Sequence, residues 1–147
     1  MLLPLLTVVV LSAALAPNAP QPPSTPAAQT SAAVTLPETP AGRALQEFVA
    51  SFNAGGEKRE AWLSDRTTLP ADGATGILKQ DAAFLSEHGP MTVVRVAEAS
   101  ASRIAAVLRH DKSGAHGYLT IDVEAAAPHK VSNMQLRAAT PEEVSGK

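Results

Sequence analysis

The sequence lacks cysteine and is poor in aromatic residues, with one Trp, one Tyr and three Phe among its 147 residues. The missing thiols exclude disulfide frameworks, thiolate zinc sites, cysteine nucleophiles and lipid attachment through an N-terminal cysteine. So few aromatic rings argue against a base-stacking platform. The formal charge of -2 argues against a basic surface for nucleic acids or membranes. We therefore expect no nucleic-acid partner.

Several catalytic and nucleotide-binding motifs are also missing. The sequence contains no S-x-x-K, G-x-S-x-G or K-T-G motif, which excludes serine hydrolases of those designs within this chain. It contains neither G-x-G-x-x-G nor G-x-x-x-x-G-K-[ST], the glycine-rich loops that cradle phosphates. We predict no cofactor, and these absences favour a non-catalytic protein over an enzyme.

The supply of core-forming side chains is small. Of the 147 residues 28 are Ala, and only 38 larger apolar residues remain. Ten of these 38 lie in the first 16 positions. The remainder is enough for one modest core, which predicts a single small folded domain.

The first 16 residues have the features of a secretory signal peptide. The segment from Leu2 to Ala16 holds Leu, Val and Ala with one Pro and no charge, and it is shorter than the roughly 20 apolar residues that span a bilayer. Ala14-Leu15-Ala16 has the small-x-small pattern that signal peptidase reads. No Lys or Arg precedes this run and Pro17 follows it, which suggests a start codon placed too late or a cut further along. We expect an exported protein, periplasmic or extracellular after cleavage, with no membrane span in the mature chain.

A proline-rich segment follows at residues 17–38. The stretch from Pro17 to Pro40 holds seven of the 12 prolines and one charged residue, Glu38. Such a composition cannot bury enough apolar surface to offset the entropy of ordering. We predict a disordered, partly extended linker.

Three helices are predicted in the first half of the following domain, residues 39–141. Helical spacing of apolar residues starts after Thr39-Pro40, which suit a helix start. The sequence Asn53-Ala54-Gly55-Gly56 ends this helix. A shorter helix over Glu57 to Leu63 and a third over about Ala74 to His88 follow, and Gly89-Pro90 ends the third.

Beyond Pro90 the apolar period changes to two, which indicates strands. Alternation in the third run puts Leu119, Ile121 and Val123 on one face, and the fourth run has a phase slip between Val131 and Met134 that suggests a bulge. The four strands are predicted at Thr92 to Glu98, Ser102 to Arg109, about Tyr118 to Glu124, and Lys130 to Ala138. Helices followed by an antiparallel meander predict an α+β domain, with three N-terminal helices on one face of a curved four-stranded sheet and a C-terminal tail at residues 142–147.

This order of elements, over about Leu36 to Pro141, resembles the nuclear-transport-factor-two-like superfamily, also called SnoaL-like or cystatin-like. More narrowly, two motifs resemble exported bacterial domains found beside beta-lactamase-type serine hydrolases. They are Thr39-Pro40-Ala41-Gly42 with Leu45, Phe48 and Phe52-Asn53-Ala54-Gly55, and Leu119 to Val123 with Pro128-His129-Lys130-Val131. The resemblance implies a cone-shaped fold and an accessory or binding module, with an exported serine hydrolase as one partner. It carries over no catalytic residue.

The candidate pocket contains four residues on the two later helices and the first strand, where a cone of this fold opens: Trp62, Phe84, His88 and Arg95. An apolar cleft with one or two polar groups is the usual small-ligand site. Trp62 and Phe84 are equally suited to core packing, His88 to the C-terminal end of a helix, and Arg95 to a solvated strand position.

A second candidate site is the sheet face opposite Leu119, Ile121 and Val123. It carries mixed charges suited to a homodimer interface, at Arg103, Arg109, Tyr118, Asp122 and Glu124. Tyr118 and Asp122 are the pair that could act as carboxylate and hydroxyl in catalysis, but their alternation points them away from the helices.

His110 and His116 flank a hairpin turn and could face each other across two strands, but two imidazoles are too few for a zinc site. We therefore expect two exposed histidines and no metal.

Two functions remain open at this point. The first is an exported, non-catalytic module that binds a small apolar ligand or a partner protein such as a serine hydrolase. The second is a small isomerase, cyclase or hydrolase of the same fold, whose acid or base residue the sequence does not identify.

Overall fold

The computed structural model describes residues 34–147. The chain divides into two units, Met1–Thr30 and Ser31–Lys147, and all described residues belong to the second. The predicted signal peptide at residues 1–16 and most of the predicted linker at residues 17–38 lie outside the described part. Within residues 34–147, none of the helices is both long and apolar enough to cross a membrane.

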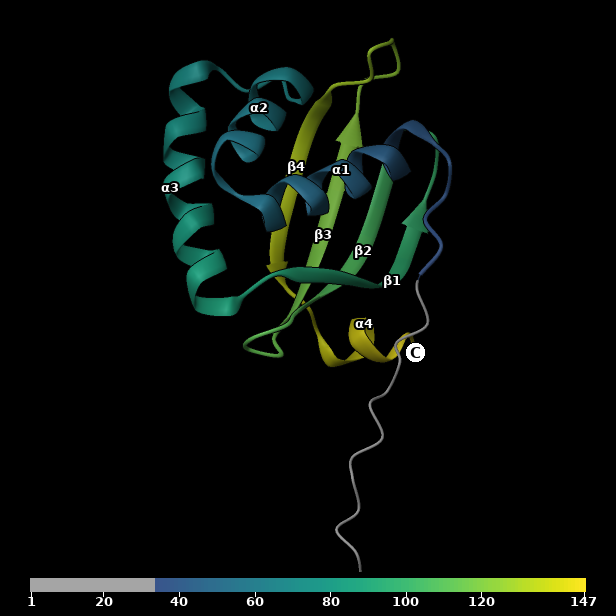
Figure 1. The fold of residues 1–147 in the computed structure, drawn as a ribbon. Helices are drawn as coiled ribbons and strands as arrows, with labels where there is room; N and C mark the ends of the chain where they lie inside the picture. Colours follow the sequence, from purple (N-terminus) through teal and green to yellow (C-terminus); the bar gives the residue numbers. More distant parts are fainter. Residues whose placement is uncertain (1–33) are drawn as a thin grey trace, which may run out of the picture. The chain divides into compact units, whose positions relative to one another are not determined.

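The described part consists of helices followed by an antiparallel sheet, as Figure 1 shows. The strands are hydrogen-bonded in the order β1-β2-β3-β4, and the sheet does not close into a barrel. The elements are α1 (Pro40–Ala54), α2 (Gly56–Arg66), α3 (Ala71–His88), β1 (Met91–Ala99), β2 (Arg103–His110), β3 (His116–Val123), β4 (Val131–Ala138) and α4 (Pro141–Ser145). The predicted α+β class is confirmed.

Helix α1 lies across the sheet and makes the main helix-to-sheet contact, with β1, β2 and β3. It begins where expected, because the Thr39 hydroxyl accepts a hydrogen bond from the Gly42 amide at 3.1 Å and Pro40 occupies the first turn. Its buried face repeats at helical spacing: Ala41, Ala44, Leu45, Phe48 and Phe52. Helices α2 and α3 then pack on α1 and on each other.

The folded part begins earlier than the predicted boundary at residue 39. Leu36 packs against the core. A Cβ atom on Gly42 would lie 1.9 Å from the Pro37 carbonyl oxygen, so only glycine allows this approach. The last residues of the predicted linker therefore belong to the domain, because α1 provides an apolar surface on which they pack.

The end of α1 is tied to the first strand. Gly55 ends the helix with φ 62°, which an L side chain adopts poorly. The Asn53 side chain donates to the Met91 carbonyl and accepts from the Met91 amide, both at 2.8 Å. The sequence predicts Asn53 as part of a helix exit, and the structure adds two hydrogen bonds between its side chain and the start of β1.

The side of the sheet that faces the helices carries the expected alternation. Leu119, Ile121 and Val123 of β3 are buried in the main core, as predicted, together with Ile104, Ala106 and Leu108 of β2. In β4, Asp122 pairs with Asn133 and Val123 with Val131, so Ser132 is the extra residue of a bulge. The predicted bulge is confirmed.

Strand β1 departs from the simple alternation predicted for it. Its pairing with β2 is irregular between Val93 and Arg95 and again between Val96 and Glu98. As a result Val93 and Val96 pack against the core, whereas strict alternation would put Val94 on the same face as Val96. Bulges bend a strand, and Figure 1 shows β1 bending across the end of the sheet.

Two further boundaries differ from the prediction. Helix α3 begins at Ala71, three residues earlier than the predicted Ala74, directly after Pro70. The predicted tail at residues 142–147 overlaps α4, which starts at Pro141, because Thr140 and Glu143 form a capping box and Arg137 pairs with Glu143 at 2.5 Å.

Candidate functional site

A cleft of about 500 Å³ lies between α3 and the sheet. Its apolar lining comes from both helices and strands: Phe48, Phe52, Ile77, Phe84, Ala115, Met134, Leu136 and Ala138. Its polar lining residues are Arg59, Gln80, Asp81, His88, His110, His116 and Arg137, with Gly117 completing the wall. An apolar cleft with a few convergent polar groups is the usual form of a small-molecule site.

Two histidine rings and one phenylalanine ring gather at one end of this cleft. The Phe84 centroid lies 4.3 Å from that of His88 and 5.0 Å from that of His110. The two imidazole centroids are 5.7 Å apart. In the described part of the chain, the Nδ1 atoms of both histidines are buried and make no hydrogen bond.

Local backbone contacts hold the two histidines together. His88 is the last residue of α3, and His110 is the last residue of β2. The amide of Lys112, in the turn after β2, donates to the His88 carbonyl at 3.1 Å, and the amide of Asp111 donates to the Pro90 carbonyl at 2.8 Å. The end of α3 is thus attached to the β2–β3 turn.

His110 is 2% exposed, which contradicts the prediction of two exposed hairpin histidines. The error has a simple cause, since His110 continues the buried series Ile104, Ala106 and Leu108 at a spacing of two. His116 is partly exposed and pairs in register with Arg109. Among residues 34–147, no three His, Asp or Glu side chains are grouped so that they could hold a metal ion.

Burial lowers the pKa of His110 from its ordinary value of 6.5, and the nearby His88 and His116 lower it further. A backbone interaction with Gly89 and the Asp111 carboxylate act in the opposite direction. The His110 ring is therefore neutral at neutral pH and presents one nitrogen that donates and one that accepts.

A buried ion pair forms another part of the cleft wall. Arg59 of α2 is 2% exposed, and its Nε lies 2.7 Å from Oδ2 of Asp81 on α3. Its Nη1 donates to the Ser51 hydroxyl at 3.2 Å. Burial lowers the pKa of the Arg59 guanidinium, and Asp81 raises it, but the guanidinium stays charged at neutral pH.

Aromatic rings surround the same guanidinium. The Arg59 Cζ atom lies 4.6 Å from the Phe48 ring centroid, 4.8 Å from that of Trp62 and 5.8 Å from that of Phe52. Cation–π contacts of this kind help to compensate a desolvated guanidinium. The sequence-based prediction missed Arg59 as a site residue, although its spacing of three and four from the buried Trp62 and Leu63 places it on their helix face.

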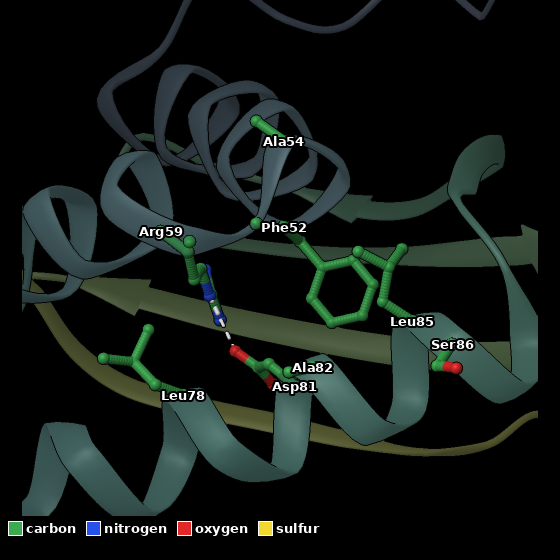
Figure 2. A pocket seen from close by; sticks show the side chains of 10 residues that line it. Phe52, Ala54, Arg59, Leu78, Asp81, Ala82, Leu85 and Ser86 are labelled. Carbon is green, nitrogen blue, oxygen red and sulfur yellow. Dashed lines mark hydrogen bonds and ion pairs between the residues drawn. The ribbon is translucent and has the colours of Figure 1, made fainter.

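The ion pair also borders a second, smaller cavity of about 370 Å³. Figure 2 shows Arg59 and Asp81 meeting across this cavity, with Leu78, Ala82, Leu85 and Ser86 of α3 along its other wall. Phe52, Arg59 and Asp81 line both cavities. The pair therefore lies in the wall of both spaces.

The structure brings together only part of the predicted pocket. Phe84 and His88 line the cleft. Trp62 is buried at 6% exposure with its ring edge-on to Phe48, centroid to centroid 5.6 Å, and it does not line the cleft. Arg95 donates to the Glu143 carbonyl of α4, away from the cleft lining.

The residues of the predicted interface lie on the sheet face turned away from the helices, and most of them pair with each other. Arg103 Nη1 lies 3.1 Å from Asp122 Oδ1, and Asn133 donates to Asp122 at 2.9 Å. Arg137 stacks over Tyr118 with Cζ 4.4 Å from the ring centroid. Two further predicted residues lie at the ends of this face: Arg109, 3.7 Å from Asp111, and Glu124, exposed just after β3.

No protein-family model matches this chain, and no curated protein or solved structure matches it significantly. The resemblance to the nuclear-transport-factor-two-like superfamily therefore stays a prediction.

Proposed function

We propose that residues 34–147 form a non-catalytic binding module that holds a small, largely apolar molecule in the cleft between α3 and the sheet. One observation carries this proposal: two imidazoles, whose buried Nδ1 atoms have no partner, line a cleft with largely apolar walls. Buried polar atoms in folded proteins nearly always have partners. A bound molecule would supply the partners that the protein itself does not.

The size and lining of the cleft support the same function. Its volume of about 500 Å³ falls within the range of roughly 300 to 1,000 Å³ for small-molecule sites. Phe84 and Met134 contribute apolar surface from opposite walls, one from α3 and one from β4. Burying an apolar ligand against such walls removes its surface from water, which favours binding.

Export and a partner protein belong to the proposal as expectations. The apolar run at residues 2–16 predicts export to the periplasm or the outside of the cell. An exported serine hydrolase is the protein partner that the family resemblance implies. The outer sheet face offers a surface for such a partner or for a homodimer, but its side chains are largely paired with each other, so the cleft gives the stronger support.

Native mass spectrometry of the protein purified from its own host's exported fraction would test the binding function. We expect a retained small molecule in the wild-type protein. Met134→Trp should abolish retention, because it fills the cleft from β4. The matched control is Gln135→Trp, since the neighbouring Gln135 is exposed and does not line the cleft. A wild-type protein that retains nothing, or retention unchanged by Met134→Trp, would contradict the proposal.

His110 supports a second candidate, a small isomerase, cyclase or hydrolase. A neutral imidazole with an unpartnered nitrogen in an apolar cleft is suited to accept a proton from a bound substrate. If the retained molecule is converted to a product of different mass or chromatographic position, and His110→Asn still retains it but stops the conversion, the protein is an enzyme. Retention without conversion supports the binding module.

A further inference from the structure

The charged groups that line the cleft are already paired. Arg59 and Asp81 pair with each other at 2.7 Å, and the side chain of Arg137 lies over Tyr118 on the outer face and pairs with Glu143. The imidazoles of His88, His110 and His116 complete the basic part of the lining. A cationic ligand would therefore find no free counter-charge in the lining, whereas an anionic ligand can accept hydrogen bonds from imidazole N–H groups.

The geometry of the histidine pair favours a head group with two oxygen atoms. The two imidazole centroids are 5.7 Å apart, with the Phe84 ring next to both. A carboxylate can accept one hydrogen bond at each of its oxygens, and this separation lets one carboxylate contact both rings. The side chain of His110 is almost wholly buried, so its unpartnered Nδ1 atom can be satisfied only from inside the protein.

We infer that the ligand is an apolar carboxylic acid, whose carboxylate lies against both His88 and His110 and whose body lies along Phe84, Phe52 and Met134. This inference rests on the proposed binding function and specifies its ligand class. The aromatic and aliphatic walls contact the apolar body of the ligand without a polar interaction. The head group therefore determines which ligands bind.

Binding of the anion is coupled to uptake of a proton by His110. The carboxylate supplies the counter-charge that a buried imidazolium needs, so the complex holds the proton at a higher pH than the free protein does. The titratable and charged groups that face His110 or line the cleft with it are His88, His116, Asp111, Arg59, Asp81 and Arg137. Arg59 pairs with Asp81, Arg137 with Glu143 and Asp111 with Arg109. His110, whose pKa burial lowers, is therefore the group whose protonation the bound anion favours.

Isothermal titration calorimetry of the full chain with matched probes would test this inference. The probes are 2-naphthoate and octanoate, each with its primary amide and its primary amine of the same body. At pH 6.5 we expect at least one carboxylate to bind about tenfold or more tightly than its amide, and the amines to bind least. The carboxylate affinity should fall as the pH rises, by up to about tenfold per pH unit.

Substitutions of the two histidines test where the carboxylate head group binds. His88→Asn and His110→Asn should each reduce the preference for carboxylate over amide. His88→Asn serves as the second test if His110→Asn does not fold, because His88 lies at the partly exposed end of α3. The matched control is His129→Asn, since His129 lies outside the cleft and Asn tolerates its φ of 56°.

The outcomes separate the inference from the proposed function. Equal binding of acid and amide, tighter binding of an amine, or a carboxylate preference that survives both histidine variants would overturn the carboxylate site and leave the binding module standing. Failure of all six probes to bind at millimolar concentration would overturn both.

Discussion

The two faces of the sheet differ in whether their polar side chains have interaction partners. On the outer face, Arg103, Asp122 and Asn133 bind one another, and Tyr118 is covered by Arg137. On the helix side, His88 and His110 leave buried nitrogen atoms without a partner. Polar groups that satisfy each other are typical of a self-sufficient surface, whereas unpartnered buried atoms call for an explanation such as a missing ligand. This contrast is the reason for proposing a binding site on the helix side of the sheet.

The largest expected effect comes from breaking the buried ion pair on the helix side. Asp81→Ala leaves the Arg59 guanidinium without its counter-charge inside the protein. We expect a loss of about 3 kcal/mol in the free energy of unfolding, measured by urea denaturation with the fluorescence of Trp62, the single Trp. Asp81→Asn is the control, because its amide oxygen can still accept from Arg59 and should limit the loss. A loss below about 1 kcal/mol for Asp81→Ala would show that the Arg59–Asp81 pair contributes no more than an exposed surface ion pair, and would contradict this prediction.

A smaller effect is expected from the pH dependence that His110 causes. Its pKa in the folded protein lies below the ordinary value of 6.5, so between these two values the unfolded chain binds more protons. The stability therefore falls as the pH falls below about 6.5 and through this window, and this contribution does not change above it. His110→Phe should flatten that part of the stability curve, measured by thermal unfolding between pH 7.5 and 5. An unchanged slope would show that His110 is not the group that titrates.

A still smaller effect is expected from the outer face. Asp122→Asn removes the charge that pairs with the half-exposed Arg103. Exposed ion pairs contribute roughly 0.2 to 1 kcal/mol, so the unfolding free energy should change by less than about 1 kcal/mol, measured by urea denaturation. A larger loss, close to that of Asp81→Ala, would remove the energetic contrast between the two faces.

The smallest effect on stability is expected at α4. Hydrogen bonds from Arg137 lower the pKa of Glu143 to about 2. The Glu143 carboxylate should therefore stay charged down to about pH 2, and its contribution to stability should be lost progressively as the pH falls from the ordinary 4.5 to about 2. NMR titration of the Glu143 carboxyl carbon should give a midpoint near 2 in the wild-type protein. Arg137→Gln should move the midpoint toward the ordinary 4.5, and a midpoint that does not move would contradict the assigned cause.

Most of the fold follows from local patterns in the sequence. The apolar spacing in α1, the alternation in β3 and the bulge in β4 each have a local cause, so they were predicted correctly. Which residues of β1 face the core was not predicted correctly, because the irregular pairing of β1 depends on the neighbouring strand β2. Such pairing is a long-range property that period counting along one strand does not detect.

The site was predicted only in part, for a different reason. Phe84 and His88 were named, but the prediction treated His110 as an exposed hairpin residue and did not consider Arg59. Both lie at positions where the spacing alone assigns them to the buried side, two residues after Leu108 and three before Trp62. Their burial depends on compensation by Asp81 and by nearby rings, which comes from elements distant in the sequence. Giving the pattern priority over the residue type would have found them.

The position of the Arg59–Asp81 pair between two cavities has a consequence for ligand size. The cleft of about 500 Å³ and the other space of about 370 Å³ both have this pair in their walls. If the cleft holds an apolar ligand, as proposed, the pair limits the length of the molecule that fits. Exchanging it for two small apolar residues should then enlarge the cleft toward the second space and allow longer ligands to bind.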